Sequence, residues 1–379
     1  MRIDRLRTFM TRDKDRPRVL LAIDTDEGIT GWGECYNHGP DRALPPLIEY
    51  LALQLAGHDP TRVEFLVQKL LQASRFPPGA LGLAAISAID HALWDISAKA
   101  LGVPVYKLLG GHVRDKVQVY CGVYTAPDPA EAKATVERLH EQWGFTAFKL
   151  SPWRLDPNQH RWGEVVKASA DYFAKLREIC PTSFDFAFDA HAKIFEPWQA
   201  VQLGNALAVS EPLFFEEPIR PEHIPAWAAL KAQLRCPLAT GECLYNRFEF
   251  LSLMAARGAD IVQPDICAVG GITEMRRIAA IAEAHYVSIA PHNPMGPLAT
   301  AVNLHFCLSQ PHFKILEYRL PDGAPYVMDP YLPEGGYLHP RPDRPGWGVE
   351  IDEQVLAKND YVHWERKLPV RPDGSTGYV

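Results

Sequence analysis

The sequence predicts an α/β protein in which a closed (β/α) barrel follows a smaller α+β unit. Two observations carry this prediction. Short apolar segments with strand character alternate with helical segments through the middle of the chain, and most of these strand segments end on an acid or a histidine. Because parallel strands in a barrel bring their carboxyl ends to one rim, this recurrence predicts a functional rim and an enzyme built around it.

Composition sets the class of protein. The 379 residues leave room for one barrel of about 250 residues and a second domain. Hydrophobic residues make up 47% and charged residues 22%, which is typical of a globular protein. The net charge of −7, without a long basic run, argues against nucleic acid or an anionic membrane as a partner.

Targeting signals and cysteine usage point to the cytoplasm. The first residues lack the apolar core of a signal peptide, and no apolar run reaches membrane-spanning length. The seven cysteines are odd in number and form no C-x-x-C pair, as expected of reduced thiols in a cytoplasmic protein.

Residues 1–115 are predicted to form the α+β unit, with a boundary near Gly110-Gly111. A turn at Asp26-Glu27-Gly28 joins two strand-like segments, and an apolar stripe at helical spacing ends at Gly102 and Pro104. The expected elements are strands over 19–23 and 30–34 and helices over 45–73 and 85–100.

Residues 116–320 are predicted to form the barrel, because they hold the eight strands that closure requires. The strand candidates are 117–123, 146–151, 185–190, 212–216, 237–241, 261–264, 287–291 and 314–318. Helices are expected over 129–142, 161–179, 197–207 and 271–284. Residues 321–379 lose this periodicity and are expected to return to the N-terminal unit and end in a polar, mobile C-terminus.

Three carboxylates, Asp189, Glu216 and Glu242, fall at the ends of successive predicted strands. Converging carboxylates repel one another unless a cation lies among them, and oxygen ligands favour a hard divalent ion, Mg²⁺ before Mn²⁺ or Ca²⁺. The competing interpretation is three ordinary acids paired with lysine or arginine. Three such acids in succession favour the metal.

Two histidines are candidates for proton transfer. Asp265 and His292 end neighbouring strands, so the carboxylate can orient the imidazole as a general base, or the pair can be a structural hydrogen bond. His191 follows Asp189 by two residues and is expected on the same face of the strand. It is a candidate acid, with orientation of the substrate as the alternative.

Lys149 and Glu317 end the second and eighth predicted strands. Lys149 can neutralise a substrate carboxylate or pair with the rim acids. Glu317, if protonated, can donate a hydrogen bond to a developing enolate oxygen, or it can be a salt-bridged acid. Together these groups suit removal of a proton alpha to a carboxylate, followed by expulsion of a β-hydroxyl as water.

Two blocks of sequence resemble the mandelate racemase subgroup of the enolase superfamily. The first is the helix Ala85–Lys99 followed by Leu101-Gly102-Val103-Pro104. The second is the ladder of Asp189, Glu216-Glu217-Pro218, Gly241-Glu242, Gln263-Pro264-Asp265, Gly270-Gly271-Ile272-Thr273, Pro291-His292 and Glu317. The resemblance implies a modified (β/α)8 TIM barrel under an α+β capping domain and Mg²⁺ on Asp189, Glu216 and Glu242. It also implies a His292–Asp265 base dyad and Glu317 as the enolate-side donor.

One departure from the subgroup narrows the expected activity. Racemases of the subgroup carry Lys-x-Lys on the second strand, where this chain has Lys149 and Ser151. The Asp189-x-His191 pattern is instead similar to that of the acid-sugar dehydratases, especially the galactonate type, in which the histidine expels the 3-hydroxyl. The resemblance thus implies a hydro-lyase acting on an aldonate such as galactonate or gluconate and giving a 2-keto-3-deoxy acid.

Three alternatives remain open at this point: an acid-sugar epimerase or racemase, a cycloisomerase, and a low-activity binding or regulatory homologue. The resemblance also implies a homo-oligomer, from dimer to octamer. Substrate stereochemistry does not follow from the sequence, although cap loops and neighbouring positions are candidates for specificity. They are Tyr36, Asn37, His38, the loop 75–79, Arg154 and Trp347.

Overall fold

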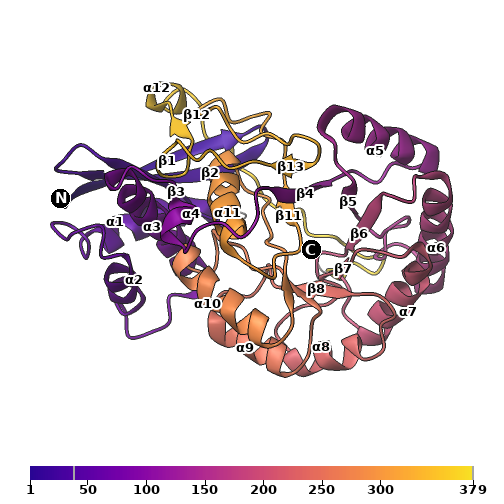
Figure 1. Ribbon diagram of the computed structural model, residues 1–379. Coiled ribbons are helices and arrows are strands. Elements are labelled where there is room, and N and C mark those ends of the chain that lie inside the picture. Colours follow the sequence, from indigo (N-terminus) through magenta and orange to yellow (C-terminus); the bar gives the residue numbers. More distant parts are fainter. Residues whose placement is uncertain (37–38, 378–379) are drawn as a thin grey trace.

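The computed structural model describes residues 1–36 and 39–377, so the candidates Asn37 and His38 lie outside the described residues. Figure 1 shows two parts, an antiparallel sheet with helices at the N-terminal end and a barrel of strands and helices beside it. The predicted fold class is therefore confirmed.

The N-terminal part is a three-stranded antiparallel sheet covered by helices. Its elements are β1 (Ile3–Asp13), β2 (Arg16–Thr25), β3 (Thr30–Glu34), η1 (Asp41–Ala43), α1 (Leu44–Ala52), α2 (Val63–Leu71), α3 (Gly79–Ala100) and α4 (Val105–Leu108). Strand β3 lies directly on α3, because a Cβ at Gly33 would come within 1.9 Å of the Ala88 carbonyl oxygen. A Cβ at Gly31 would likewise come within 2.1 Å of the Ala92 carbonyl oxygen. Glycine is thus what lets the strand and the long helix touch.

The barrel contains eight parallel strands in the order β10-β9-β8-β7-β6-β5-β4-β11. They are β4 (Val117–Gly122), β5 (Ala147–Leu150), β6 (Asp185–Asp189), β7 (Phe215–Glu216), β8 (Leu238–Thr240), β9 (Ile261–Val262), β10 (Ser288–Ile289) and β11 (Leu316–Tyr318). The ring is completed beside β10, where Ile289 bridges Phe313 and accepts a 2.8 Å hydrogen bond from the Lys314 amide. Each strand falls within a segment that the sequence predicted.

Seven main helices connect the strands, and all but the last of them form the outer arc in Figure 1. They are α5 (Pro129–Trp143), α6 (Trp162–Ile179), α7 (Pro197–Leu207), α8 (Ile224–Lys231), α9 (Arg247–Ala255), α10 (Gly271–Ala284) and α11 (Pro297–Ser309), with the short η2 (Ala208–Ser210) after α7. Within the described chain the next helix after β11 is the four-residue α12 (Glu353–Leu356), so the barrel is modified by the loss of its eighth helix. Helix α11 was not predicted because it is buried on nearly all sides and shows no amphipathic period.

The C-terminal segment runs back over both parts. Its short strands are β12 (Val327–Met328), β13 (Tyr337–Leu338) and β14 (Glu350–Ile351), and β13 pairs antiparallel with β4. The Trp347 indole nitrogen donates to the Trp32 carbonyl at 3.0 Å, and the Asn359 amide donates to the Arg12 carbonyl at 2.8 Å. The segment thereby holds the N-terminal sheet and then continues toward the barrel mouth.

Two further expectations concern membrane-spanning segments and the cysteines. None of the helices in the described residues has the length and apolar character needed to cross a bilayer. All seven cysteines are free thiols, five of them buried.

Candidate functional site

The three predicted metal ligands meet at the rim. Asp189 ends β6 and lies in register with Glu216 at the end of β7, and Glu242 follows β8, the next strand of the sheet. Ligand oxygens of these three carboxylates all lie within 4.8 Å of one another. Asp189 and Glu216 are almost completely buried. The parallel pairing of β6, β7 and β8 brings these three carboxylates, which are distant in the sequence, together in one acidic cluster.

The chemistry of this cluster fits a hard divalent cation. Asp189 Oδ2, Glu216 Oε2 and Glu242 Oε2 are buried and accept no hydrogen bond within the described structure. Burial and the charge of Asp189 raise the pKa of Glu216 well above its usual range. Buried acceptors without a hydrogen bond are rare and costly. Asp189 Oδ2 and Glu242 Oε2 do lie 3.1 and 3.4 Å from Lys149 Nζ and His292 Nε2, but three carboxylates gathered this closely suit a shared divalent cation.

Lys149, at the end of β5, lies among the acids. Its Nζ is 3.0 Å from Glu216 Oε1, 3.1 Å from Asp189 Oδ2 and 2.9 Å from Glu317 Oε1. Burial lowers the pKa of this ammonium, but the surrounding carboxylates outweigh burial and raise it well above its usual range. The geometry favours the interpretation that Lys149 pairs with the rim acids.

His292 and Asp265 form a hydrogen-bonded pair. A parallel bridge joins their backbones beyond β9 and β10, and His292 Nδ1 lies 2.8 Å from Asp265 Oδ2. The other ring nitrogen, Nε2, is 3.4 Å from Glu242 Oε2. Burial lowers the pKa of His292, but Glu242 and the hydrogen bond to Asp265 outweigh it and raise the pKa to about 10. The imidazole can therefore accept a proton only when the charge of Glu242 is compensated.

The sequence did not predict the backbone conformation that places His191 at the site. Strand β6 ends at Asp189, so His191 lies beyond the strand, and both His191 and Ala192 have left-handed backbones with φ of 50° and 54°. The His191 amide donates to Asp189 Oδ1 at 2.8 Å, and the ring Nε2 lies 3.2 Å from Asp189 Oδ2. The expectation of a shared strand face was wrong. A tight turn folds the imidazole back over Asp189 and leaves it 44% exposed.

Glu317, on β11, is held as a carboxylate. Its Oε2 accepts a 2.9 Å hydrogen bond from the Asn293 amide, and its other oxygen pairs with Lys149. Burial raises the pKa of Glu317, but Lys149 and His292 outweigh burial and hold it below its usual range. The structure thus favours the salt-bridged interpretation over a protonated donor.

Two cavities meet at the histidines. One, of about 500 Å³, contains Tyr36 and Glu242 in its wall, and the other, of about 630 Å³, contains Lys149 and Glu317. His191 and His292 line both cavities. A substrate at this junction would lie between two imidazoles and beside the acidic cluster.

The other candidates for substrate specificity differ in whether they line a cavity. Tyr36 lines the first cavity, with its ring centroid 6.4 Å from that of His292. Arg154 lines the second cavity, but its guanidinium already donates to the Pro127 carbonyl at 3.0 Å. Trp347 is buried against the N-terminal sheet. No residue of the loop 75–79 is among the described residues that line either cavity.

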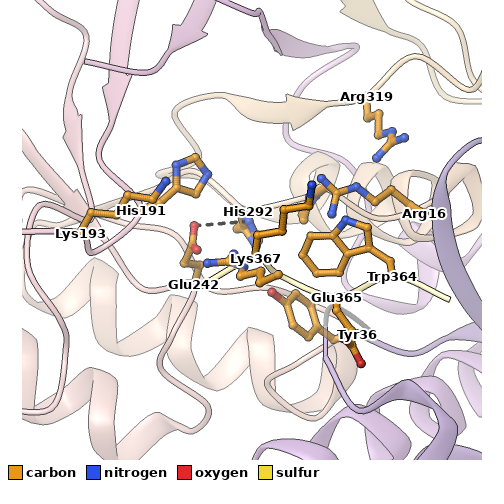
Figure 2. Close-up of a pocket in the computed structure, with 12 residues that line it drawn as sticks. Arg16, Tyr36, His191, Lys193, Glu242, His292, Arg319, Trp364, Glu365 and Lys367 are labelled. Carbon is orange, nitrogen blue, oxygen red and sulfur yellow. Dashed lines mark ion pairs between the residues drawn. The ribbon is translucent and has the colours of Figure 1, made fainter. Parts of the chain in front are cut away.

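The first cavity also contains residues that the sequence did not single out (Figure 2). They are Arg16, Lys193, Arg319, Trp364, Glu365, Arg366 and Lys367. The last four belong to the segment that was expected to be a mobile polar tail. An aromatic residue inside a charged run, at Trp364, is the signal in the sequence that could have drawn attention to it.

Known proteins resemble the chain over nearly its whole length. Relatives called D-galactonate dehydratase, from Variovorax paradoxus (strain S110) and Ralstonia pickettii (strain 12J), are 38% and 36% identical, with 99% of each chain covered.

Solved structures also resemble the chain over nearly its whole length. An enolase of Agrobacterium radiobacter, named as a candidate galactarate dehydratase and bound to Na and L-malate, is 64% identical with full coverage of both chains and a TM-score of 0.98. A mandelate racemase/muconate lactonizing enzyme candidate from Labrenzia alexandrii DFL-11 is 33% identical, with a TM-score of 0.88 over 96% of this chain and 98% of that one.

Family models cover both parts of the molecule. Residues 4–110 match the N-terminal domain of mandelate racemase / muconate lactonizing enzyme, and residues 131–355 match the enolase C-terminal domain-like family. Members of this superfamily use a divalent metal, which agrees with the acidic cluster on the rim. With its capped, modified barrel and carboxylate ladder, the chain belongs to the mandelate racemase subgroup of the enolase superfamily.

Proposed function

We propose that the protein is a Mg²⁺-dependent dehydratase of a six-carbon sugar acid, which removes the C2 proton and the 3-hydroxyl to give a 2-keto-3-deoxy acid. The observation that carries this proposal is the position of His191 and His292, which line the same two cavities beside the cluster of Asp189, Glu216 and Glu242. The names of relatives, D-galactonate dehydratase and candidate galactarate dehydratase, support the reaction class.

The three clustered carboxylates would hold the Mg²⁺. When bound, the ion supplies positive charge next to the substrate carboxylate and stabilises the negative charge that develops as C2 loses its proton. Lys149 adds a fixed positive charge on the same side, because its Nζ contacts Asp189, Glu216 and Glu317.

His292 is the proposed base. Asp265 engages Nδ1, so the lone pair that can take the C2 proton is on Nε2, which points toward the cluster. A base acts through its neutral form, so the high pKa of His292 must fall when Glu242 is neutralised.

His191 is the proposed acid. Its ring lies 3.2 Å from a carboxylate oxygen of Asp189, and its partly exposed position lets it exchange protons with water. It gives a proton to the departing 3-hydroxyl as the C3–O bond breaks and the C2–C3 double bond forms. The resulting enol gains a proton at C3 and loses the proton of its 2-hydroxyl, which gives the 2-keto acid.

The test separates proton removal from elimination. His292→Asn should abolish both keto-acid formation and exchange of the C2 hydrogen in D₂O. His191→Asn should abolish keto-acid formation while exchange at C2 persists. A screen of hexonates, pentonates and aldarates with Mg²⁺ identifies the substrate, and NMR of the product distinguishes a keto acid from an epimer. Exchange that persists in His292→Asn would remove His292 as the base.

A further inference from the structure

We propose that five basic residues in the first cavity bind a second carboxylate at the far end of the substrate, so that the preferred substrate is a dicarboxylic sugar acid. These residues are Arg16, Lys193, Arg319, Arg366 and Lys367, and we call them the basic wall. The inference rests on the proposed function for the placement of the reacting end at the acidic cluster.

The first cavity concentrates positive charge. The wall places five lysine and arginine side chains around a cavity whose acids are Glu242, a member of the acidic cluster, and Glu365. The chain as a whole carries a net charge of −7, so this concentration of positive charge is local. A concave site of one sign attracts and orients a ligand of the opposite sign.

The wall brings cations close to one another. Burial and the charge of Arg366 hold the pKa of Lys193 below its usual range. Burial, followed by the charge of Arg319 among the neighbouring cations, does the same for Arg16 despite the opposing effect of Asp15. Neighbouring cations destabilise one another's charged forms, and an anion bound between them stabilises those charged forms.

In the opposite cavity both cations are engaged, whereas in the basic wall Arg16 stacks on Trp364 but Arg319 has long ion pairs. Lys149 contacts three carboxylates, and the Arg154 guanidinium lies 4.1 Å from the Tyr172 ring and donates to the Pro127 carbonyl. In the wall, by contrast, the ion pairs of Arg319 with Asp13 and Asp15 are 3.7 and 3.9 Å long. These pairs are too long for hydrogen bonds, so Arg319 keeps donors to offer. A distal carboxylate is therefore best accommodated on the side of the basic wall.

Residues 361–370 hold part of the wall in place. At one end the Arg42 guanidinium lies 5.4 Å from the ring of Tyr361, and at the other Gln159 donates to the Val370 carbonyl at 2.6 Å. Between these anchors Arg16 stacks over Trp364 at 4.1 Å (Figure 2). The segment thus spans from the N-terminal part to the loop before α6 and presents Arg366 and Lys367 to the cavity. In Figure 2 Lys193 comes from the opposite side, next to His191.

The experiment compares two substrates that differ only at the far end. Galactarate carries a carboxylate at C6 where galactonate carries a hydroxymethyl group, and their C2 to C5 stereochemistry can be matched. For the Mg²⁺-loaded wild type, kcat/KM should be higher for galactarate. Lys193→Gln and Lys367→Gln should each lower kcat/KM for galactarate about tenfold, the effect of losing one charged contact, and should lower kcat/KM for galactonate by a smaller factor.

Lys358→Gln is the matched control. It removes the same charge from an exposed position of the C-terminal segment that does not line the cavity, and it should change neither substrate. Equal losses for both substrates in the two wall variants, or no preference of the wild type for galactarate, would overturn the basic wall as a carboxylate site.

Calorimetric binding with Mg²⁺ separates the two proposals. If neither acid is dehydrated but galactarate binds more tightly than galactonate, and Lys193→Gln abolishes that difference, the carboxylate site stands and the proposed reaction fails. If both acids are dehydrated and bind equally, the reaction stands and the carboxylate site fails.

Discussion

Asp265 and Glu242 contact opposite nitrogens of the same imidazole, 2.8 Å from Nδ1 and 3.4 Å from Nε2 of His292. The first contact orients the ring, and the second raises its pKa through the charge of a residue that also belongs to the acidic cluster. The proton affinity of the proposed base is thereby coupled to the occupancy of the cluster, and this coupling can be measured.

In the metal-free protein we expect His292 to titrate near pH 10. Its raised pKa stabilises the fold fully below the unfolded value of about 6.5, and this contribution is lost as pH rises through about 10. Mg²⁺ should move the titration to lower pH because it compensates Glu242. NMR titration of the ring with and without Mg²⁺ measures the shift. His305, whose pKa burial lowers to about 4, is the internal control. An unchanged His292 titration would contradict the coupling.

Asp265→Asn should reduce kcat by about 10²–10⁴-fold, the range of general acid–base contributions, because the amide no longer fixes the tautomer with Nε2 free. The stabilisation of the protein by Mg²⁺, measured as a shift in Tm, should persist because Asp265 is outside the acidic cluster. Loss of that shift would mean that the substitution had damaged the metal site itself.

Glu216→Gln should abolish the Mg²⁺-dependent rise in Tm and yet stabilise the metal-free protein at pH 7. A buried carboxyl whose pKa is raised opposes folding above its unfolded pKa, and the neutral amide removes that penalty. Differential scanning fluorimetry with and without Mg²⁺ tests both signs. Glu137→Gln makes the same charge change on the exposed face of α5 and should alter neither measurement. A destabilised metal-free Glu216→Gln variant would show that the contact with Lys149 outweighs the repulsion.

Gly33→Ala should destabilise the protein by about 3 kcal/mol, because the new methyl group meets the Ala88 carbonyl of α3 at 1.9 Å. Urea unfolding measures the loss. Gly163→Ala is the matched control, since a Cβ there has no atom within 4 Å and the position lies in helix α6. Equal stability of the two variants would show that the β3–α3 contact adapts.

Much of the rim was predictable because the carboxyl ends of parallel barrel strands meet at one rim, where the polar residues that end the strands come together. Asp189 and Glu216 end neighbouring strands, as the order of the predicted strands implied, and the structure places them in register. The left-handed turn at His191 was not predictable, because contacts made in the folded rim determine a backbone that histidine rarely adopts. The position of Lys367 was equally inaccessible, since it depends on anchors at Arg42 and Gln159 that are remote in the sequence.

The ammonium of Lys149, set among Asp189, Glu216 and Glu317, has a consequence for the order of folding and metal binding. This internal counter-ion offsets part of the mutual repulsion of the carboxylates that would otherwise spread the barrel mouth before a divalent metal binds. Folding of the rim and binding of the divalent metal thereby become separable steps.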